Sequence, residues 1–194
     1  MPSIAVLASG TGTLLQALIE SSVREHIVAV GSDVADAPAL SKAREAGIET
    51  FVVAVGTDRE KWNSDLVARL EGYGTELVVC AGFMRILGPA TLAAYPGRII
   101  NSHPALLPAF PGAHAVADAL AYGVKVTGCT IHVVDGGVDT GPIVAQQAIV
   151  IDENDDADTL QERIKQVERV LLVDVVQKIL VSGLSVNGRS VTFG

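Results

Sequence analysis

Short aliphatic runs alternate along the chain with segments of helical pattern, and this alternation limits the fold more than any other feature of the sequence. The aliphatic runs cover residues 3–8, 26–30, 49–53, 76–81, 98–101, 127–134 and 143–151. Runs that are apolar at nearly every position are typical of parallel strands buried on both faces. We therefore expect an α/β fold, with a Rossmann-like, open and mostly parallel sheet and helices on both of its faces.

Helical patterns fill the intervals between these runs. The expected helices cover residues 14–23, 37–46, 58–72, 89–94, 114–122 and 158–182, and the last dozen residues form a short hairpin or tail. Thr57 is the expected cap of the third helix, with Glu60 reaching back to complete a capping box. No repeat or linker interrupts the chain, so we expect its 194 residues to form a single domain.

Charge and cysteine content argue against several classes of function. A net charge of −8 opposes binding to nucleic acid or to an anionic membrane, because both favour a basic face. Cys80 and Cys129 lie in apolar runs without the spacing of metal ligands, so we expect buried thiols and no metal site. The first run follows no basic or long apolar segment, and we expect a cytoplasmic protein with neither signal peptide nor membrane span.

Polar residues follow the ends of several expected strands. Asn101 and His103 alternate in an extended segment, so their side chains point to the same side, and Pro104 keeps His103 extended. Asp139 opens an Asp-Thr-Gly-Pro turn. An amide, an imidazole and a carboxylate can together stabilise an oxyanion and move a proton. Each residue alone has a structural alternative: Asn101 as a turn cap, His103 as a satisfied loop histidine, and Asp139 as a turn residue.

Residues 9–13, with the sequence Ser-Gly-Thr-Gly-Thr, lie where the first strand leads into the first helix. Backbone N–H groups at such a position bind anions, although a plain turn would look the same. Leu15 replaces the third glycine of the dinucleotide fingerprint, so a single terminal phosphate fits better than a pyrophosphate.

The other polar residues have ordinary structural interpretations when each is considered alone. The pair Lys165 and Glu168 has the spacing of a solvated ion pair on a helix. His132 lies in an expected strand and is interpreted as a structural residue, and Arg59 and Arg85 are interpreted as surface cations.

Together these segments resemble the formyltetrahydrofolate-dependent formyltransferases over nearly the whole chain. The resemblance is carried by residues 81–87 (Ala-Gly-Phe-Met-Arg-Ile-Leu), 101–108 (Asn-Ser-His-Pro-Ala-Leu-Leu-Pro), 111–112 (Pro-Gly) and 139–142 (Asp-Thr-Gly-Pro). It implies transfer of a formyl group from the co-substrate 10-formyltetrahydrofolate to the amine of 5-phosphoribosylglycinamide (glycinamide ribonucleotide), in de novo purine biosynthesis. It also implies a cis peptide bond between Leu107 and Pro108, and a monomer or homodimer.

The resemblance also implies a role for individual residues. Asn101, His103 and Asp139 match the catalytic trio, which acts through a tetrahedral intermediate without a metal. The residues that match the ribotide site are Gly12, Thr13, Leu14, Lys165, Gln166, Val167 and Glu168. Those that match the folate site are Arg59, Met84, Arg85, Ile86, Leu87, Asn101, Asp135, Gly136, Gly137, Val138 and Asp139. Residues 1–97 would then be a phosphate-binding half, and residues 98–194 a catalytic and folate-binding half.

Two positions depart from the family pattern, and other functions stay open. The family usually has Ser-Asn where this chain has Thr13-Leu14, and often Gln at Lys165, so phosphate binding must depend more on N–H groups and Thr13. A formyltetrahydrofolate hydrolase, or a formyltransferase acting on another amine, would share the trio. A methionyl-tRNA formyltransferase would be expected to have a basic face and a further domain. A nucleotide-binding regulator would not need the trio.

Overall fold

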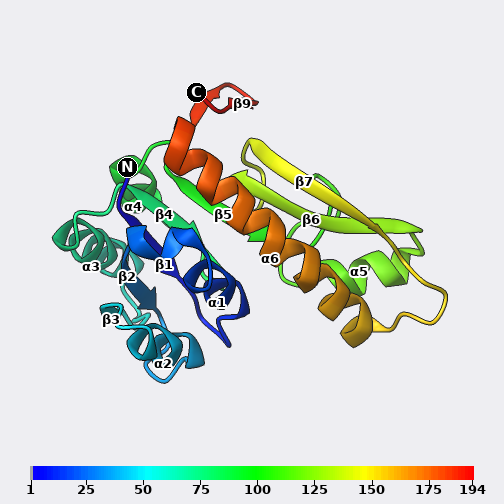
Figure 1. Cartoon of the computed structure of the whole chain (residues 1–194), viewed down its shortest axis with the longest axis horizontal. Helices are drawn as coiled ribbons and strands as arrows, with labels where there is room; N and C mark the ends of the chain where they lie inside the picture. Colours follow the sequence, from blue (N-terminus) through cyan, green and yellow to red (C-terminus); the bar gives the residue numbers. More distant parts are fainter. Residues whose placement is uncertain (1) are drawn as a thin grey trace.

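The computed structural model describes residues 2–194, and its centre is a seven-stranded sheet in the order β3-β2-β1-β4-β5-β6-β7. The strands are β1 (Ile4–Leu7), β2 (Ile27–Ser32), β3 (Thr50–Val52), β4 (Leu77–Cys80), β5 (Ile99–His103), β6 (Val126–Val133) and β7 (Ile143–Val150). The first five pair in parallel, whereas β6 and β7 are antiparallel to their neighbours. The expected open, mostly parallel α/β sheet is confirmed (Figure 1).

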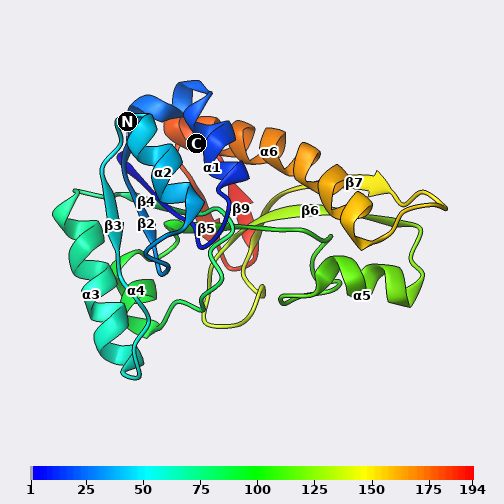
Figure 2. The same ribbon diagram turned by 90° about the horizontal axis from the view of Figure 1, so that it is seen from below.

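Helices cover both faces of the sheet, as expected (Figure 2). One face carries α1 (Thr13–Ile19), α2 (Pro38–Glu45) and α6 (Ala157–Ser182), and the other carries α3 (Arg59–Gly72) and α4 (Pro89–Ala94). Ile4 and Val6 of β1 pack into the first of these cores, and Ala5 and Leu7 into the second. Both sides of the strand are therefore buried, which explains why the run has no polar alternation.

A smaller core lies at the far end of the sheet, where α5 (Ala115–Tyr122) meets the first turns of α6. Val116 of α5 packs there with Cys129, Leu160 and Ile164. Within residues 2–194 no helix, α6 included, is both long and apolar enough to cross a membrane.

Two helix boundaries differ from the sequence-based expectation. The first helix ends at Ile19, because Ser21 accepts a hydrogen bond from Val23 N and starts a separate 3₁₀ turn, η1 (Ser22–His26). The third helix is capped by Asp58, whose Oδ1 accepts from Lys61 N at 2.9 Å, so the expectation of Thr57 as the cap is wrong by one residue. In both places a short polar side chain selects the turn at which the helix begins or ends.

The chain reverses its direction of travel across the sheet at β1, which lies between β2 and β4. The connections that follow β1 and β4 therefore lead to opposite sides of this point, which is where ligands bind in open α/β sheets. This topology places residues 9–13 and 82–87 at the same carboxyl edge of the sheet.

The expected carboxyl-terminal hairpin is present and contacts a distant loop. It consists of β8 (Ser185–Asn187) and β9 (Ser190–Thr192). Between them, Arg189 donates through Nη1 to the carbonyl oxygen of Thr140 at 3.0 Å and through Nη2 to that of Gly141 at 3.4 Å. The hairpin thus braces the loop that joins β6 to β7.

Close packing of β6 on β7 gives a test of the sheet. A Cβ added to Gly128 would collide with the backbone carbonyl of Gln147 on the paired strand. We expect Gly128→Ala to lower the free energy of unfolding by roughly 1–3 kcal/mol, measured by urea denaturation. Gly72→Ala, at the end of α3 with open space around it, is the control and should not destabilise. An unchanged midpoint for Gly128→Ala would contradict the packing described here.

Candidate active site

A cavity of about 610 Å³ opens at the carboxyl edge of the sheet. Its walls are the loops that leave β1, β4 and β5, the loop between β6 and β7, and one side of α6. The expected site residues that line it are Gly12, Thr13, Leu14, Met84, Arg85, Ile86, Leu87, Asn101, His103, Asp135, Gly137, Val138, Asp139, Lys165 and Glu168. The structure therefore brings together segments that lie as far apart in the sequence as the first and last helices.

Four expected site residues do not line the cavity: Arg59, Gly136, Gln166 and Val167. On α6, Lys165 and Glu168 share the face toward the cavity, whereas the two residues between them turn away because successive helix residues point in different directions. Val167 packs instead beside the small core at the start of α6.

Arg59 acts on the site through the backbone. Its Nη2 donates to the carbonyl oxygen of Ile86 at 2.6 Å, and its guanidinium lies 4.3 Å from the centre of the Trp62 ring. Arg59 thus holds the end of the loop that leaves β4 rather than facing the cavity. Gly136 belongs to a turn in which the Asp135 carboxylate accepts hydrogen bonds from Gly137 N and the Thr140 hydroxyl.

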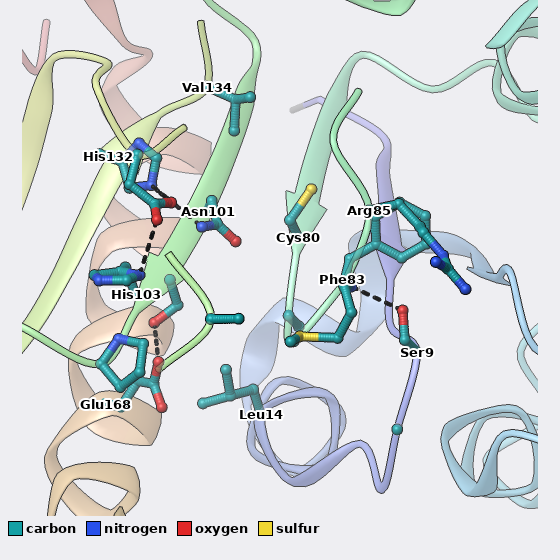
Figure 3. A pocket seen from close by; sticks show the side chains of 18 of the residues that line it. Ser9, Leu14, Cys80, Phe83, Arg85, Asn101, His103, His132, Val134 and Glu168 are labelled. Carbon is teal, nitrogen blue, oxygen red and sulfur yellow. Dashed lines mark hydrogen bonds and ion pairs between the residues drawn. The ribbon is translucent and has the colours of Figure 1, made fainter. Parts of the chain in front are cut away.

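Asn101, His103 and Asp139 meet on one wall of the cavity. Figure 3 shows Asn101 and His103 on the same side, facing Cys80 and Phe83 across the opening. His103 Nδ1 lies 3.3 Å from Asp139 Oδ2, and His103 Nε2 lies 2.8 Å from the carbonyl oxygen of Phe110. Both ring nitrogens therefore face oxygen atoms, which fixes the orientation of the ring in the cavity wall.

His132 lies in β6, as expected for a strand residue, and it also belongs to the same cluster, a position that the sequence-based expectation does not include. Its Nε2 lies 3.2 Å from Asn101 Nδ2 and 3.4 Å from Asp139 Oδ1. His132 is directly opposite Asn101 in the antiparallel β5–β6 pair, and opposed residues project to the same face of a sheet. The register of that pair is the signal that would have identified it.

Asp139 is held as a carboxylate by its neighbours. The hydrogen bond with His132 is the largest cause that lowers its pKa, to about 2, and the bond from Gly112 N at 2.8 Å and the charge of His103 add to it against the opposing effect of burial. Its φ of 54° lies in the left-handed region, which residues other than glycine seldom adopt. The turn interpretation of Asp139 is thus correct, and it coexists with a place beside both histidines.

The loop after β5 is fixed by side chains of the antiparallel strands. Thr130 Oγ1 donates to the carbonyl oxygen of Ala105 at 2.6 Å and accepts from Leu107 N at 3.0 Å, and Gln146 Nε2 donates to the carbonyl oxygen of Leu107 at 2.8 Å. The Leu107–Pro108 bond is cis, which confirms the expectation. These contacts set the position from which the chain returns over the cavity to Phe110 and Gly112.

Glu168 lies inside the protein, not on a solvated helix face as its pairing with Lys165 suggested. The residue is 5% exposed, and Ser102 Oγ donates to its Oε1 at 2.5 Å. Burial raises its pKa, and the bond from Ser102 opposes this only in part. Lys165 lies nearer to Glu162, with 3.7 Å between Nζ and Oε2.

The two cysteines are buried, as expected, and burial raises the pKa of each thiol to about 12. Neither has the thiolate character that nucleophilic catalysis requires. No group of His, Cys, Asp and Glu side chains among residues 2–194 is arranged to hold a metal ion.

The raised pKa of Glu168 predicts a pH-dependent gain in stability for Glu168→Gln. Above the unfolded pKa of about 4.5, the carboxyl ionises more readily in the unfolded chain, so the wild type loses stability as the pH rises. We expect Glu168→Gln to unfold at higher urea concentration than the wild type at pH 8, with a smaller advantage at pH 4. The exposed Glu153→Gln variant controls for loss of charge. An advantage that is equal at both pH values would contradict the shift.

Comparison with known proteins finds formyltransferases that are similar over most of the chain. The formyl transferase family matches residues 3–176. The phosphoribosylglycinamide formyltransferase of Mycobacterium tuberculosis (strain H37Rv) is 50% identical, over 98% of this chain and 91% of that protein. The protein of the same name from Bacillus subtilis is 39% identical, over 93% of this chain and 95% of its own length.

A solved structure is also similar to this chain in sequence and fold. The glycinamide ribonucleotide transformylase 1 of Symbiobacterium toebii is 40% identical, with a TM-score of 0.95, and the alignment covers all of this chain and 94% of that one. The family match and the similarity in sequence and fold lead to one conclusion. The chain belongs to the formyl transferase family.

Proposed function

We propose that this protein transfers the formyl group of 10-formyltetrahydrofolate to the amine of 5-phosphoribosylglycinamide, a step of de novo purine biosynthesis. The observation that carries the proposal is the meeting of Asn101, His103 and Asp139 in a single cavity between two sets of loops. Relatives that share half of the sequence and bear the name phosphoribosylglycinamide formyltransferase support the choice of acceptor.

The proposed reaction needs one oxyanion site and one proton relay. The amine nitrogen attacks the formyl carbon, a new C–N bond forms, and the carbonyl oxygen becomes an oxyanion. Asn101 donates to that oxygen through its side-chain amide, and His103 stabilises it through the charge of its ring, because both ring nitrogens face Asp139 and Phe110. Collapse of the intermediate breaks the bond to the folate nitrogen, which takes up the proton that the amine loses.

In the proposed reaction, Asp139 acts as a fixed negative charge. Because its pKa is held near 2, it is ionised throughout the physiological range and favours the protonated form of His103 beside it. A water molecule held by the same carboxylate would relay the proton from the amine to the leaving nitrogen.

The two substrates are assigned to opposite parts of the cavity. The ribotide phosphate is assigned to Gly12, Thr13 and Leu14, with Lys165 supplying positive charge and Glu168 near the sugar or the amine. The folate is assigned to residues 84–87 and 135–139. Arg59 would support the folate indirectly, through its bond to Ile86.

Two other reactions could use the same trio of residues. One assay distinguishes them from the proposed reaction. A formyltetrahydrofolate hydrolase releases formate without an amine acceptor, and a formyltransferase for another amine would not use 5-phosphoribosylglycinamide. Formylation of this ribotide, with little formate released in its absence, supports the proposal, and the reverse result rejects it.

We further propose that the protein is cytoplasmic, in keeping with two unpaired thiols and small-molecule substrates. Neither nucleic acid nor a membrane is a proposed partner. The proposed assembly is a monomer or a homodimer.

The proposed mechanism predicts large losses of rate on removal of the trio. We expect His103→Ala and Asp139→Ala each to lower kcat by at least ~10²-fold, because oxyanion stabilisation is lost or the charge that sustains it is removed. Steady-state formyl transfer measures the effect, and circular dichroism checks that the variants fold. Turnover close to wild type in either folded variant would refute the mechanism.

A substitution at Gly10 tests the assignment of the phosphate. Gly12 is unsuitable, because its φ is 70° and a Cβ there would lie 2.8 Å from Ala39 Cβ, whereas Gly10 has open space around it. Gly10 lines the cavity beside the residues assigned to the phosphate, so we expect the added side chain of Gly10→Val to crowd the phosphate and raise KM for the ribotide about tenfold, with KM for the folate unchanged. Gly56→Val, in an open loop, is the control. A rise in KM for the folate alone would mean that the substrates are assigned the wrong way round.

A further inference from the structure

A buried carboxylate lies between two loops of the cavity without lining it. Asp33 directly follows β2, and its side chain is only 1% exposed. Its Oδ1 accepts from Ser9 Oγ at 2.6 Å, and its Oδ2 accepts from Arg85 Nε at 2.6 Å. Each oxygen of the carboxylate is thus used by a different loop.

The same loops are joined a second time at Ser9. Its hydroxyl donates to Asp33 and accepts from Met84 N at 2.8 Å, a contact drawn in Figure 3 between Ser9 and the loop beside Phe83. Ser9 N also donates to the carbonyl oxygen of Gly82 at 3.0 Å. The loop after β1 and the loop after β4 therefore share one hydrogen-bond network that is anchored at the end of β2.

The tip of the loop after β4, residues 84–86, has few other contacts that could hold it in place. Met84 is 63% exposed and Ile86 is 62% exposed, so burial of apolar side chains does not hold its tip. Apart from the bond between Arg59 and Ile86, the fixed points of residues 84–86 in the described chain are the contacts to Asp33 and Ser9. On either side of this tip Phe83 stacks on Trp62 and Leu87 is buried, so the carboxylate fixes the tip of the loop rather than its ends.

The charge of Asp33 strengthens the dependence of the loop on this contact. Asp33 is almost fully buried, and within residues 2–194 its ion-pair partner is Arg85, whose side chain is 44% exposed. A buried charge that keeps only part of its hydrogen bonds is costly, so the carboxylate favours the arrangement in which both loops contact it.

We propose that Asp33 is a positioning residue that fixes the phosphate-binding loop and the folate-binding loop against each other. The proposal rests on the proposed function, because that function assigns residues 12–14 to the ribotide and residues 84–87 to the folate. Loss of one carboxylate, outside the cavity, then weakens the binding of two different substrates.

Steady-state kinetics of three variants test the proposal. We expect Asp33→Ala to raise KM for both substrates roughly tenfold, since it removes a charged hydrogen bond from each loop. Asp33→Asn keeps one acceptor but loses the charge and the second acceptor, so it should recover only part of the loss and give KM values between those of the wild type and Asp33→Ala. Asp36→Ala removes the same charge from an exposed position of the same segment and should behave as the wild type.

A measurement that does not need activity separates this proposal from the proposed function. We expect hydrogen exchange to speed up together in residues 9–13 and 82–87 of Asp33→Ala and to stay unchanged in Asp36→Ala. Faster exchange in both loops supports the link between them, even if the wild type fails to formylate the ribotide. Exchange that rises in one loop only, or a KM that changes for one substrate only, overturns the proposal. So does a loss of global stability with both KM values unchanged.

Discussion

Burial of the central strands on both faces is the constraint on which the site depends. β1 and β4 are neighbours whose side chains fill one core or the other, so neither strand has room for a polar group along its length. Polar chemistry is therefore confined to the loops at their carboxyl ends. The sheet changes character at β5, whose antiparallel partner β6 brings a histidine directly opposite Asn101. The parallel part of the sheet supplies loops, and the antiparallel part supplies side chains from within strands.

Two carboxyl groups in this cavity are shifted in opposite directions by their surroundings. Asp139 receives hydrogen bonds and faces two histidines, which favour its charge, whereas Glu168 is buried with a single hydroxyl as its donor. Such a separation lets one site keep a permanent anion beside a carboxyl group that can hold a proton more readily. The difference arises from the elements that carry them, an open turn for Asp139 and the packed face of a helix for Glu168.

Local sequence signals predicted the order and type of the elements, the single sheet with helices on both faces, and most of the cavity wall. They succeeded because β1 and β4 are unbroken apolar runs, the other strands contain apolar stretches, and the loops of the cavity follow strand ends. They failed where two elements far apart in the chain must be placed in register. His132 depends on the pairing of β6 with β5, and the burial of Glu168 depends on Ser102 facing α6.

Smaller errors have local causes. The cap at Asp58 rather than Thr57 was a choice between adjacent residues with similar capping ability. Gln166 and Val167 were included with their neighbours because a motif match gives a continuous segment, whereas a helix presents only part of each turn to a cavity. Arg59 is expected near the folate, but its contact in the structure is with the carbonyl oxygen of Ile86 in the loop after β4.

The backbone at Asp139 has a consequence for engineering and for evolution. Its left-handed conformation would suit glycine better than aspartate, so backbone geometry taken alone would favour replacement at this position. The same replacement would remove the carboxylate that two histidines contact. A stability-guided library built on this scaffold should therefore hold residue 139 constant, because the contacts that lower the pKa of its carboxyl also stabilise the folded chain at neutral pH.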